Sequence, residues 1–359
     1  MRLEGIDVLR GTAVGFVVLY HFFELLGLQQ HFLYPYVFSL GQLGVPLFFV
    51  ISGYLIYRSV DYSISKKGIK RGLKNYIVHR LFRILPAYYI NFIFIFIIAY
   101  FILGTMDTWS FSFIKRQIIS HLTFMSYFIY KSSGFGVNGA YWTLSIEMLW
   151  YIIAPLFFIF IKQDRYYLVI VSIALLYILS IDFQLWDTYL NLNYTQINYL
   201  PMQYYLYFQL VAQILYFIVG IFIYKYVIQF KSMDKLNTCI LFVVVIFIFF
   251  ISSTHVYFIN IFIIKMFITL ITVSLLFTLF YNKKLAFLQP LGWLGKISYS
   301  IYLWHMPILY LMKKFDIFSY DSLINIFVIF IIILLLVSSI SYYLIEEGGF
   351  KLREYFLKK

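Results

Sequence analysis

Four ionisable side chains interrupt an otherwise apolar stretch at residues 6–27: Asp7, Arg10, His21 and Glu24. A charged group inside a membrane-spanning helix costs roughly 2.5 kcal/mol or more, so such groups are rarely kept without a role. Arg10 and His21 are eleven residues apart, which is about three helical turns and about 16 Å, so they share one helix face. Imidazole can accept a proton near neutral pH, which makes His21 a candidate catalytic residue and Arg10 its partner in the site.

The same stretch also has a structural interpretation. Arg10 would then extend its guanidinium to the membrane interface, and His21 would be hydrogen-bonded inside a helical bundle. Asp7 is placed three residues from Arg10, and Glu24 three residues from His21, so each acid can pair with its neighbour. The stretch alone does not decide between these interpretations.

Other polar groups are predicted at comparable depth in later helices. Glu147 lies six residues into the apolar segment 141–161, which places it about 9 Å below the outer interface, close to the depth expected for His21 in a core of about 30 Å. A carboxylate beside an imidazole fixes its tautomer and supports its charge, so Glu147 is a second catalytic candidate. A purely structural buried pair remains the alternative.

A further group of residues is assigned to the path of the substrate through the bundle. These residues are Ser52, Trp142, Ser145, Tyr302 and His305. Ser52 stands beside Gly53, and small residues of this kind also serve simply to let two helices approach closely.

Arg80 and Arg83 are three residues apart and share one helix face shortly before Pro86. The planar guanidinium group binds phosphate oxygens through two parallel hydrogen bonds, so this pair is suited to binding phosphate. Interaction with lipid headgroups at a cytoplasmic interface is the alternative.

Composition identifies a polytopic membrane protein. Of the 359 residues, 63% are hydrophobic and 12% are charged, and the mean hydropathy is +0.87; ordinary globular proteins are about 25% charged. The net charge of +13 is attributed to basic loops that face anionic membrane lipid, and not to nucleic-acid binding. Cys239 is the only cysteine, so no internal disulfide can form. No metal site is expected.

Apolar runs of suitable length predict an all-α fold with about ten transmembrane helices. The predicted spans are 6–27, 42–60, 83–104, 141–161, 165–182, 204–225, 237–253, 257–281, 296–312 and 323–345. The apolar segment 117–130 is about 14 residues long, which is short for a span and suits a re-entrant or interfacial helix.

The distribution of Lys and Arg sets the expected orientation. With ten spans and both termini in the cytoplasm, 21 basic residues fall on the inner side and five on the outer side, in agreement with the positive-inside rule. Lys265 lies within a predicted span and has no assigned role beyond that of a counter-ion. The predicted location is therefore the inner (cytoplasmic) membrane.

The longest predicted outer loop, at about 182–203, contains no Lys or Arg and is rich in Asn, Gln, Tyr and Trp. Aromatic faces and amides suit stacking on sugars and hydrogen bonding to their hydroxyls. An ordinary interfacial aromatic belt is the alternative.

Five motifs, in order across nearly the whole chain, resemble the acyltransferase-3 family of integral membrane acyltransferases, which commonly O-acetylate surface polysaccharides. The motifs are IDVLRGTAVGFVVLYHF with its Arg10-to-His21 spacing, PLFFVISGYLI, Arg80-Leu-Phe-Arg83, YWTLSIEMLWYIIAPL and ISYSIYLWHMPIL. The resemblance implies a ten-helix domain in which His21 is the catalytic histidine. It implies acyl-donor handling or site architecture for Arg10, Arg80 and Arg83, and a place in the active-site region for Glu147.

The resemblance also implies acyl-CoA, most commonly acetyl-CoA, as co-substrate. We expect residues 1–350 to form the transmembrane domain and 351–359 a short basic tail, without the fused SGNH-type domain that some relatives carry. The expected acceptor is a hydroxyl of a cell-envelope glycan or glycolipid, such as O-antigen, capsule or exopolysaccharide. Membrane lipid is a further partner, nucleic acid is not, and a homo-oligomer is compatible with the sequence.

In the expected mechanism the thioester reaches His21, which deprotonates the acceptor hydroxyl or is itself acylated, with Glu147 or Glu24 orienting the imidazole. Two alternatives remain open. The chain could be a polysaccharide exporter or flippase component without chemistry of its own, although no inverted repeat is seen. The acceptor could also be a small lipid, an antibiotic or an amine.

Overall fold

The computed structural model describes residues 4–104, 110–126, 138–162, 210–226, 272, 277, 288–317 and 322–358. All regular structure within these ranges is helical, and they contain no strand. Outside them lie the predicted spans 165–182 and 237–253, nearly all of 257–281, the predicted outer loop 182–203, and Lys265.

The chain divides into two compact units. The first comprises Met1–Leu55 and Tyr216–Ser339, and the second comprises Ile56–Leu215 and Ile340–Lys359. Each unit therefore combines an N-terminal with a C-terminal part of the sequence, and each is described by itself below.

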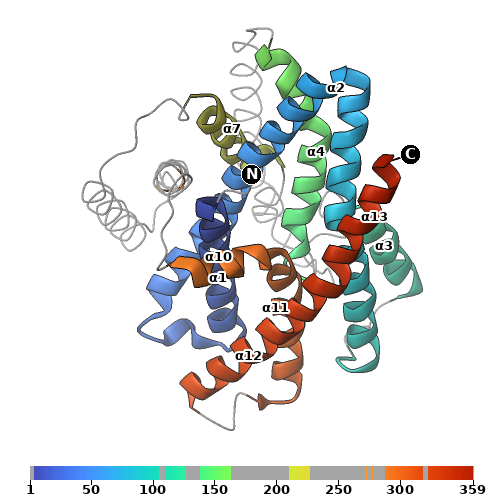
Figure 1. Cartoon of the computed structure of the whole chain (residues 1–359). Helices are drawn as coiled ribbons and strands as arrows, with labels where there is room; N and C mark the ends of the chain where they lie inside the picture. The colour runs from blue at the N-terminus through green and yellow to red at the C-terminus, as the bar shows by residue number, and fades with distance from the viewer. Residues whose placement is uncertain are drawn as a thin grey trace, which may run out of the picture. The chain divides into compact units, whose positions relative to one another are not determined.

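In the first unit, α1 (Glu4–Leu25) packs against α10 (Gln289–Lys296) and α11 (Ser298–Lys314). The approach of α1 to α10 is close because glycines meet there. A Cβ atom at Gly11 would overlap the carbonyl oxygen of Leu291, and one at Gly295 would overlap that of Asp7. The labels in Figure 1 show α10 beside α1.

A second close approach joins α2 (Tyr34–Phe101) to α7 (Leu210–Tyr226) in the first unit. A Cβ atom at Gly53 would overlap the carbonyl oxygen of Phe217, and one at Gly220 would overlap that of Val50. Phe49 stacks on Phe217 with ring centroids 4.7 Å apart. The small residues beside Ser52 therefore allow backbone-to-backbone packing, as the structural interpretation of that segment predicted.

The second unit contains the later part of α2, α3 (Phe111–Leu122), α4 (Tyr141–Lys162) and α13 (Glu347–Lys358). A π-helical turn at Tyr342–Glu346 connects α12 (Leu323–Ser341) to α13. The residues predicted to form a short tail are thus mostly helical and belong to α13.

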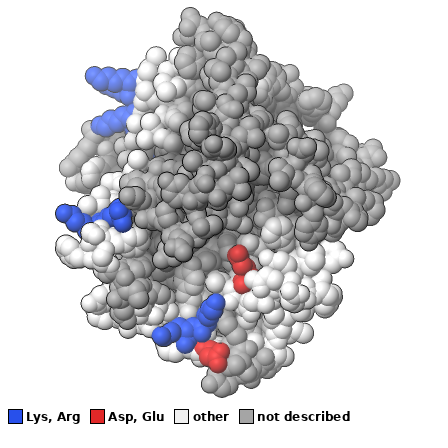
Figure 2. Space-filling model, turned by 180° about the vertical axis from the view of Figure 1, so that it is seen from behind, with Lys and Arg blue, Asp and Glu red and all other residues white. Residues whose placement is uncertain are grey.

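Among the described residues, four helices are long and apolar enough to cross a membrane: Glu4–Leu25, Tyr34–Phe101, Tyr141–Ile159 and Leu323–Leu357. The predicted total of about ten stays a prediction. Where described residues reach the face shown in Figure 2, most of their surface is uncharged and the charged side chains form a few small groups.

The long helix α2 covers two predicted spans, 42–60 and 83–104, which are joined through residues expected to form a loop. The helix is interrupted at Gly68, whose φ of 73° and ψ of 172° lie outside the helical region. Only glycine adopts such a positive φ without strain. The helix bends there so sharply that a Cβ at Gly72 would lie 2.7 Å from the Cα of Ile64.

The short helix predicted at 117–130 is α3, which begins at Phe111 and ends at Leu122. It begins earlier than predicted because Ser110 caps it, accepting a hydrogen bond from the Phe113 backbone N–H at 3.3 Å. Beyond the helix, Phe124 has a φ of 58°. The 12 residues of α3 extend about 18 Å, which is too short to cross a membrane core of about 30 Å.

Candidate functional site

The imidazole rings of His21 and His305 meet in the first unit. The Nδ1 atom of His21 lies 3.1 Å from the Nε2 atom of His305, and the ring centroids are 5.1 Å apart. His305 is completely buried, whereas His21 is half-buried. Two residues that the sequence suggested separately, on α1 and α11, thus form one pair.

Aromatic side chains surround this pair. The Tyr20 ring centroid lies 5.1 Å from that of His21, and the Tyr302 centroid lies 5.6 Å from that of His305. Phe48, one turn before the half-buried Ser52 on α2, meets Tyr302 edge-on at 6.0 Å. Part of the predicted substrate path, Tyr302 and His305, is therefore contiguous with His21.

The other ionisable groups of α1 take different positions. Arg10 and Asp7 are half-buried on the same helix as His21. Glu24 is exposed, and its carboxyl group is hydrogen-bonded by the Tyr20 side chain. Within the first unit, the ring that contacts the Nδ1 atom of His21 is that of His305, whereas the Glu24 carboxyl group is bonded to Tyr20.

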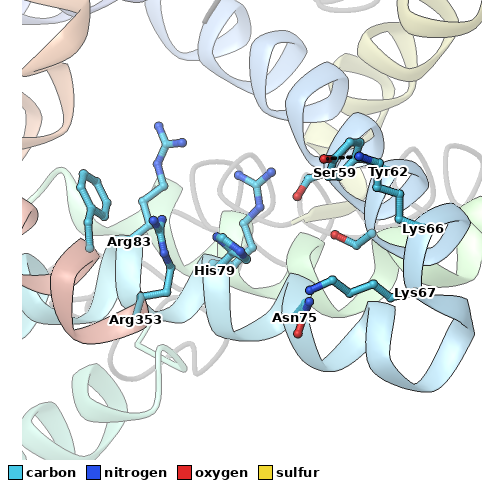
Figure 3. A pocket seen from close by; sticks show the side chains of 11 residues that line it. Ser59, Tyr62, Lys66, Lys67, Asn75, His79, Arg83 and Arg353 are labelled. Atoms are coloured by element: carbon cyan, nitrogen blue, oxygen red, sulfur yellow. Dashed lines mark hydrogen bonds between the residues drawn. The ribbon is translucent and has the colours of Figure 1, made fainter. Parts of the chain in front are cut away.

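A basic cavity of about 350 Å³ lies in the second unit. It is formed by α2 on both sides of the Gly68 bend and by α13. Figure 3 shows Arg83, His79 and Arg353 on one side of it, and Tyr62, Lys66 and Lys67 on the other. The lining residues are Ser59, Tyr62, Ser63, Lys66, Lys67, Asn75, His79, Arg80, Arg83, Phe350 and Arg353.

The basic side chains of the cavity are held by neighbouring groups. The Lys66 ammonium donates to the Tyr62 hydroxyl at 2.8 Å, drawn as the dashed line in Figure 3. Arg353 lies 3.7 Å from Glu354, its sequence neighbour. His79 lies between the predicted spans, and burial followed by the charges of Arg353, Arg80 and Lys67 lowers its pKa. Five Lys and Arg side chains line the cavity, and their positive charge favours an anion there.

Arg80 is the most buried cation of the cavity, with 9% of its surface exposed. Its guanidinium carbon lies 5.8 Å from the ring centroid of Tyr76 and 5.5 Å from that of Tyr151. Such contacts favour the charged group and fix its plane. The predicted pair Arg80 and Arg83 thus lines one cavity.

Glu147 lies on α4 within the second unit and accepts a hydrogen bond from the Tyr151 hydroxyl at 2.8 Å. Two further predicted path residues, Trp142 and Ser145, are buried on the same helix. The Ser145 hydroxyl donates to the Tyr141 carbonyl at 3.5 Å. Glu147 is thereby connected through Tyr151 to the wall of the basic cavity.

Four basic residues that line the cavity were not predicted as site residues: Lys66, Lys67, His79 and Arg353. Lys66 and Lys67 belong to the basic residues between Arg58 and Arg83, which contributed to the predicted orientation and were not singled out individually. Arg353 was counted as part of the tail. The available signal was the amphipathic character of 347–358, where Arg353 and Phe350 are three residues apart and share one helix face.

Long apolar helices, a pair of imidazoles in contact and a basic cavity define a helical membrane protein with groups for acid–base chemistry and for anion binding. The chain belongs to the acyltransferase-3 family, whose acyltransferase domain matches residues 3–345. This confirms the family that the motifs suggested.

Curated relatives carry related names. The chain is 28% identical over 387 residues to the O-acetyltransferase OatA of Staphylococcus aureus (strain NCTC 8325 / PS 47), covering 99% of this chain and 59% of that protein. It is 27% identical over 372 residues to a provisionally named O-acetyltransferase of S. aureus (strain COL), covering 96% of this chain and 56% of that protein. The chain thus spans a little over half the length of these relatives. The comparison with solved structures gives no significant match.

Proposed function

We propose that this protein transfers an acyl group, in the first instance acetyl, from cytoplasmic acyl-CoA to a hydroxyl group of a cell-envelope glycan. The observation that carries the proposal is the basic cavity lined by Arg80, Arg83 and Arg353. The names of the relatives support an O-acetyltransferase. The chemistry requires a phosphate-rich donor, a proton acceptor and a water-poor site, and the described residues supply candidates for each.

The donor is expected to bind through its phosphates. Arginine forks match phosphate geometry, and Lys66 and Lys67 add positive charge at the opposite wall. A volume of about 350 Å³ is at the lower end of the range for small-molecule sites, so it suits the phosphorylated part of the donor. Arg10 is expected to contact the pantetheine arm on its way to His21.

His21 is the proposed base. Its imidazole takes the proton of the acceptor hydroxyl, the oxygen forms a bond to the thioester carbonyl carbon, and the carbon–sulfur bond breaks. The CoA thiolate leaves and is protonated by the imidazolium, which restores neutral His21. In a two-step version His21 attacks the thioester carbonyl carbon and the CoA thiolate leaves. The acceptor hydroxyl then takes the acyl group from His21, and the hydroxyl proton passes to the thiolate.

The proposed setting is the cytoplasmic membrane, with both termini on the cytoplasmic side. The basic cavity then faces the compartment that holds acyl-CoA, and the acceptor arrives from the other side. The proposed acceptors are glycans or glycolipids of the envelope.

The test is transfer from radiolabelled acetyl-CoA in inverted membrane vesicles that contain the authentic acceptor, with identification of the labelled product. Wild type is compared with His21→Ala and with the control His31→Ala, which removes a histidine of the α1–α2 connection. We expect label on a glycan in wild type and control, and none with His21→Ala. A folded protein that releases no thiol from acetyl-CoA or longer acyl-CoAs would overturn the proposal in favour of an exporter component.

A further inference from the structure

We propose that His305 is a positioning residue that holds His21 in one tautomer and supports its positive charge during acyl transfer. The inference rests on the proposed function, in which His21 is the base or the nucleophile. It assigns to a second histidine the task that a carboxylate was expected to perform.

The hydrogen bonds of His305 determine which of its nitrogens carries the proton. Its Nδ1 atom lies 2.7 Å from the carbonyl oxygen of Tyr302. A carbonyl oxygen can only accept, so Nδ1 of His305 must carry the hydrogen. In the neutral ring the Nε2 atom then carries a lone pair and no hydrogen. This atom lies 3.1 Å from the Nδ1 atom of His21.

It follows that the Nδ1 atom of His21 donates to His305. The His21 ring is also hydrogen-bonded to the backbone of Val17, four residues earlier on α1. His121 makes the equivalent contact through its Nδ1 atom, which lies 2.9 Å from the Gln117 carbonyl oxygen. A hydrogen on Nδ1 of His21 is therefore compatible with both contacts.

The opposite arrangement fails at His305. If Nε2 of His305 carried the hydrogen, the bare Nδ1 atom of that ring would face the Tyr302 carbonyl at 2.7 Å. Two acceptors in contact repel each other, so the hydrogen stays on Nδ1 of His305 and its Nε2 atom accepts from His21.

This arrangement leaves Nε2 of His21 with the free lone pair. That nitrogen is the one able to take a proton from a hydroxyl or to attack a thioester. When it does so, the imidazolium keeps donating from Nδ1 to His305, and the bond becomes charge-assisted and stronger. His305 can hold its position because it is completely buried on α11.

The experiment compares three substitutions of His305 in the full-length protein. His305→Gln places an amide oxygen near the former Nε2 atom and keeps an acceptor for His21. His305→Asn has a shorter side chain that does not reach that far and is the matched control. His305→Phe keeps the ring shape without either hydrogen bond. Each is measured for kcat and for KM of acetyl-CoA, with thermal unfolding and gel filtration in detergent.

We expect His305→Phe and His305→Asn to lower kcat at least about tenfold, because the tautomer and orientation of a catalytic imidazole control its reactivity. KM of acetyl-CoA should change less than about twofold. His305→Gln should recover most of the activity at a melting temperature similar to that of His305→Asn. Full activity of His305→Phe, or equal activity of the Gln and Asn variants, would overturn the inference.

The outcomes separate this inference from the proposed function. If wild type transfers the acyl group and His21→Ala does not, a result in which His305 variants behave like wild type refutes only the positioning role. Absence of transfer by wild-type protein refutes the proposed function itself. Should the Phe variant fail to fold, the Gln and Asn pair still decides the question.

Discussion

The Tyr151 hydroxyl donates to the Glu147 carboxylate at 2.8 Å, one turn earlier on α4, and the Tyr151 ring lies 5.5 Å from the Arg80 guanidinium carbon. Tyr76 joins the same group, because its hydroxyl donates to the Tyr151 backbone carbonyl at 3.0 Å. All these aromatic residues are buried. Glu147, which the sequence suggested as the partner of His21, is therefore linked through Tyr151 to Arg80 in the lining of the basic cavity.

The ring and the hydroxyl of Tyr151 should have separable effects. Tyr151→Phe removes the bond to Glu147 but keeps the ring beside Arg80, so we expect a loss of about 1–3 kcal/mol of stability and a KM of acetyl-CoA within about twofold of wild type. Tyr151→Leu removes the ring as well and should raise KM further. Thermal unfolding and steady-state kinetics measure both effects. Equal KM values for the two variants would show that the ring does not hold Arg80.

Arg353 should contribute to donor affinity without contributing to chemistry. Its side chain has 21% of its surface exposed, and a partly exposed hydrogen bond to phosphate is worth about 1 kcal/mol. We expect Arg353→Gln to raise KM of acetyl-CoA about three- to tenfold, with kcat unchanged. Lys351→Gln on the same helix is the control, because it removes an equal charge from outside the cavity. The same KM for both variants would show that only net charge matters.

Several helices could be predicted closely, because apolar length alone marks a membrane span. The segment 6–27 corresponds to Glu4–Leu25, and 141–161 to Tyr141–Lys162. The bend of α2 at Gly68 was missed, since a polar basic segment between two spans is also what an ordinary loop contains. Helix propensity and periodicity do not distinguish a continuous helix that bends at a glycine from two helices joined by a loop.

The partners of the site residues could not be predicted. His21 and His305 are 284 residues apart in the sequence, and only the packing of α1 with α10 and α11 brings their rings together. Predicted depth in the membrane was the available guide, and it favoured Glu147 as the partner of His21. Arg353 was overlooked for a related reason, because its role depends on where α13 packs.

The glycine contacts between α2 and α7 give a prediction that is independent of the chemistry. A Cβ at Gly53 would overlap backbone atoms of Phe217, which cannot move aside as a flexible side chain can. Gly53→Ala should therefore destabilise the protein by about 1–3 kcal/mol or more, seen as a lower melting temperature in detergent.

Gly15→Ala on α1 is the matched control, because nothing lies within 4 Å of its added methyl group. It should keep the melting temperature or raise it slightly, since alanine favours the helix over glycine by about 1 kcal/mol. If Gly53→Ala were as stable as Gly15→Ala, the two helices would not pack backbone to backbone.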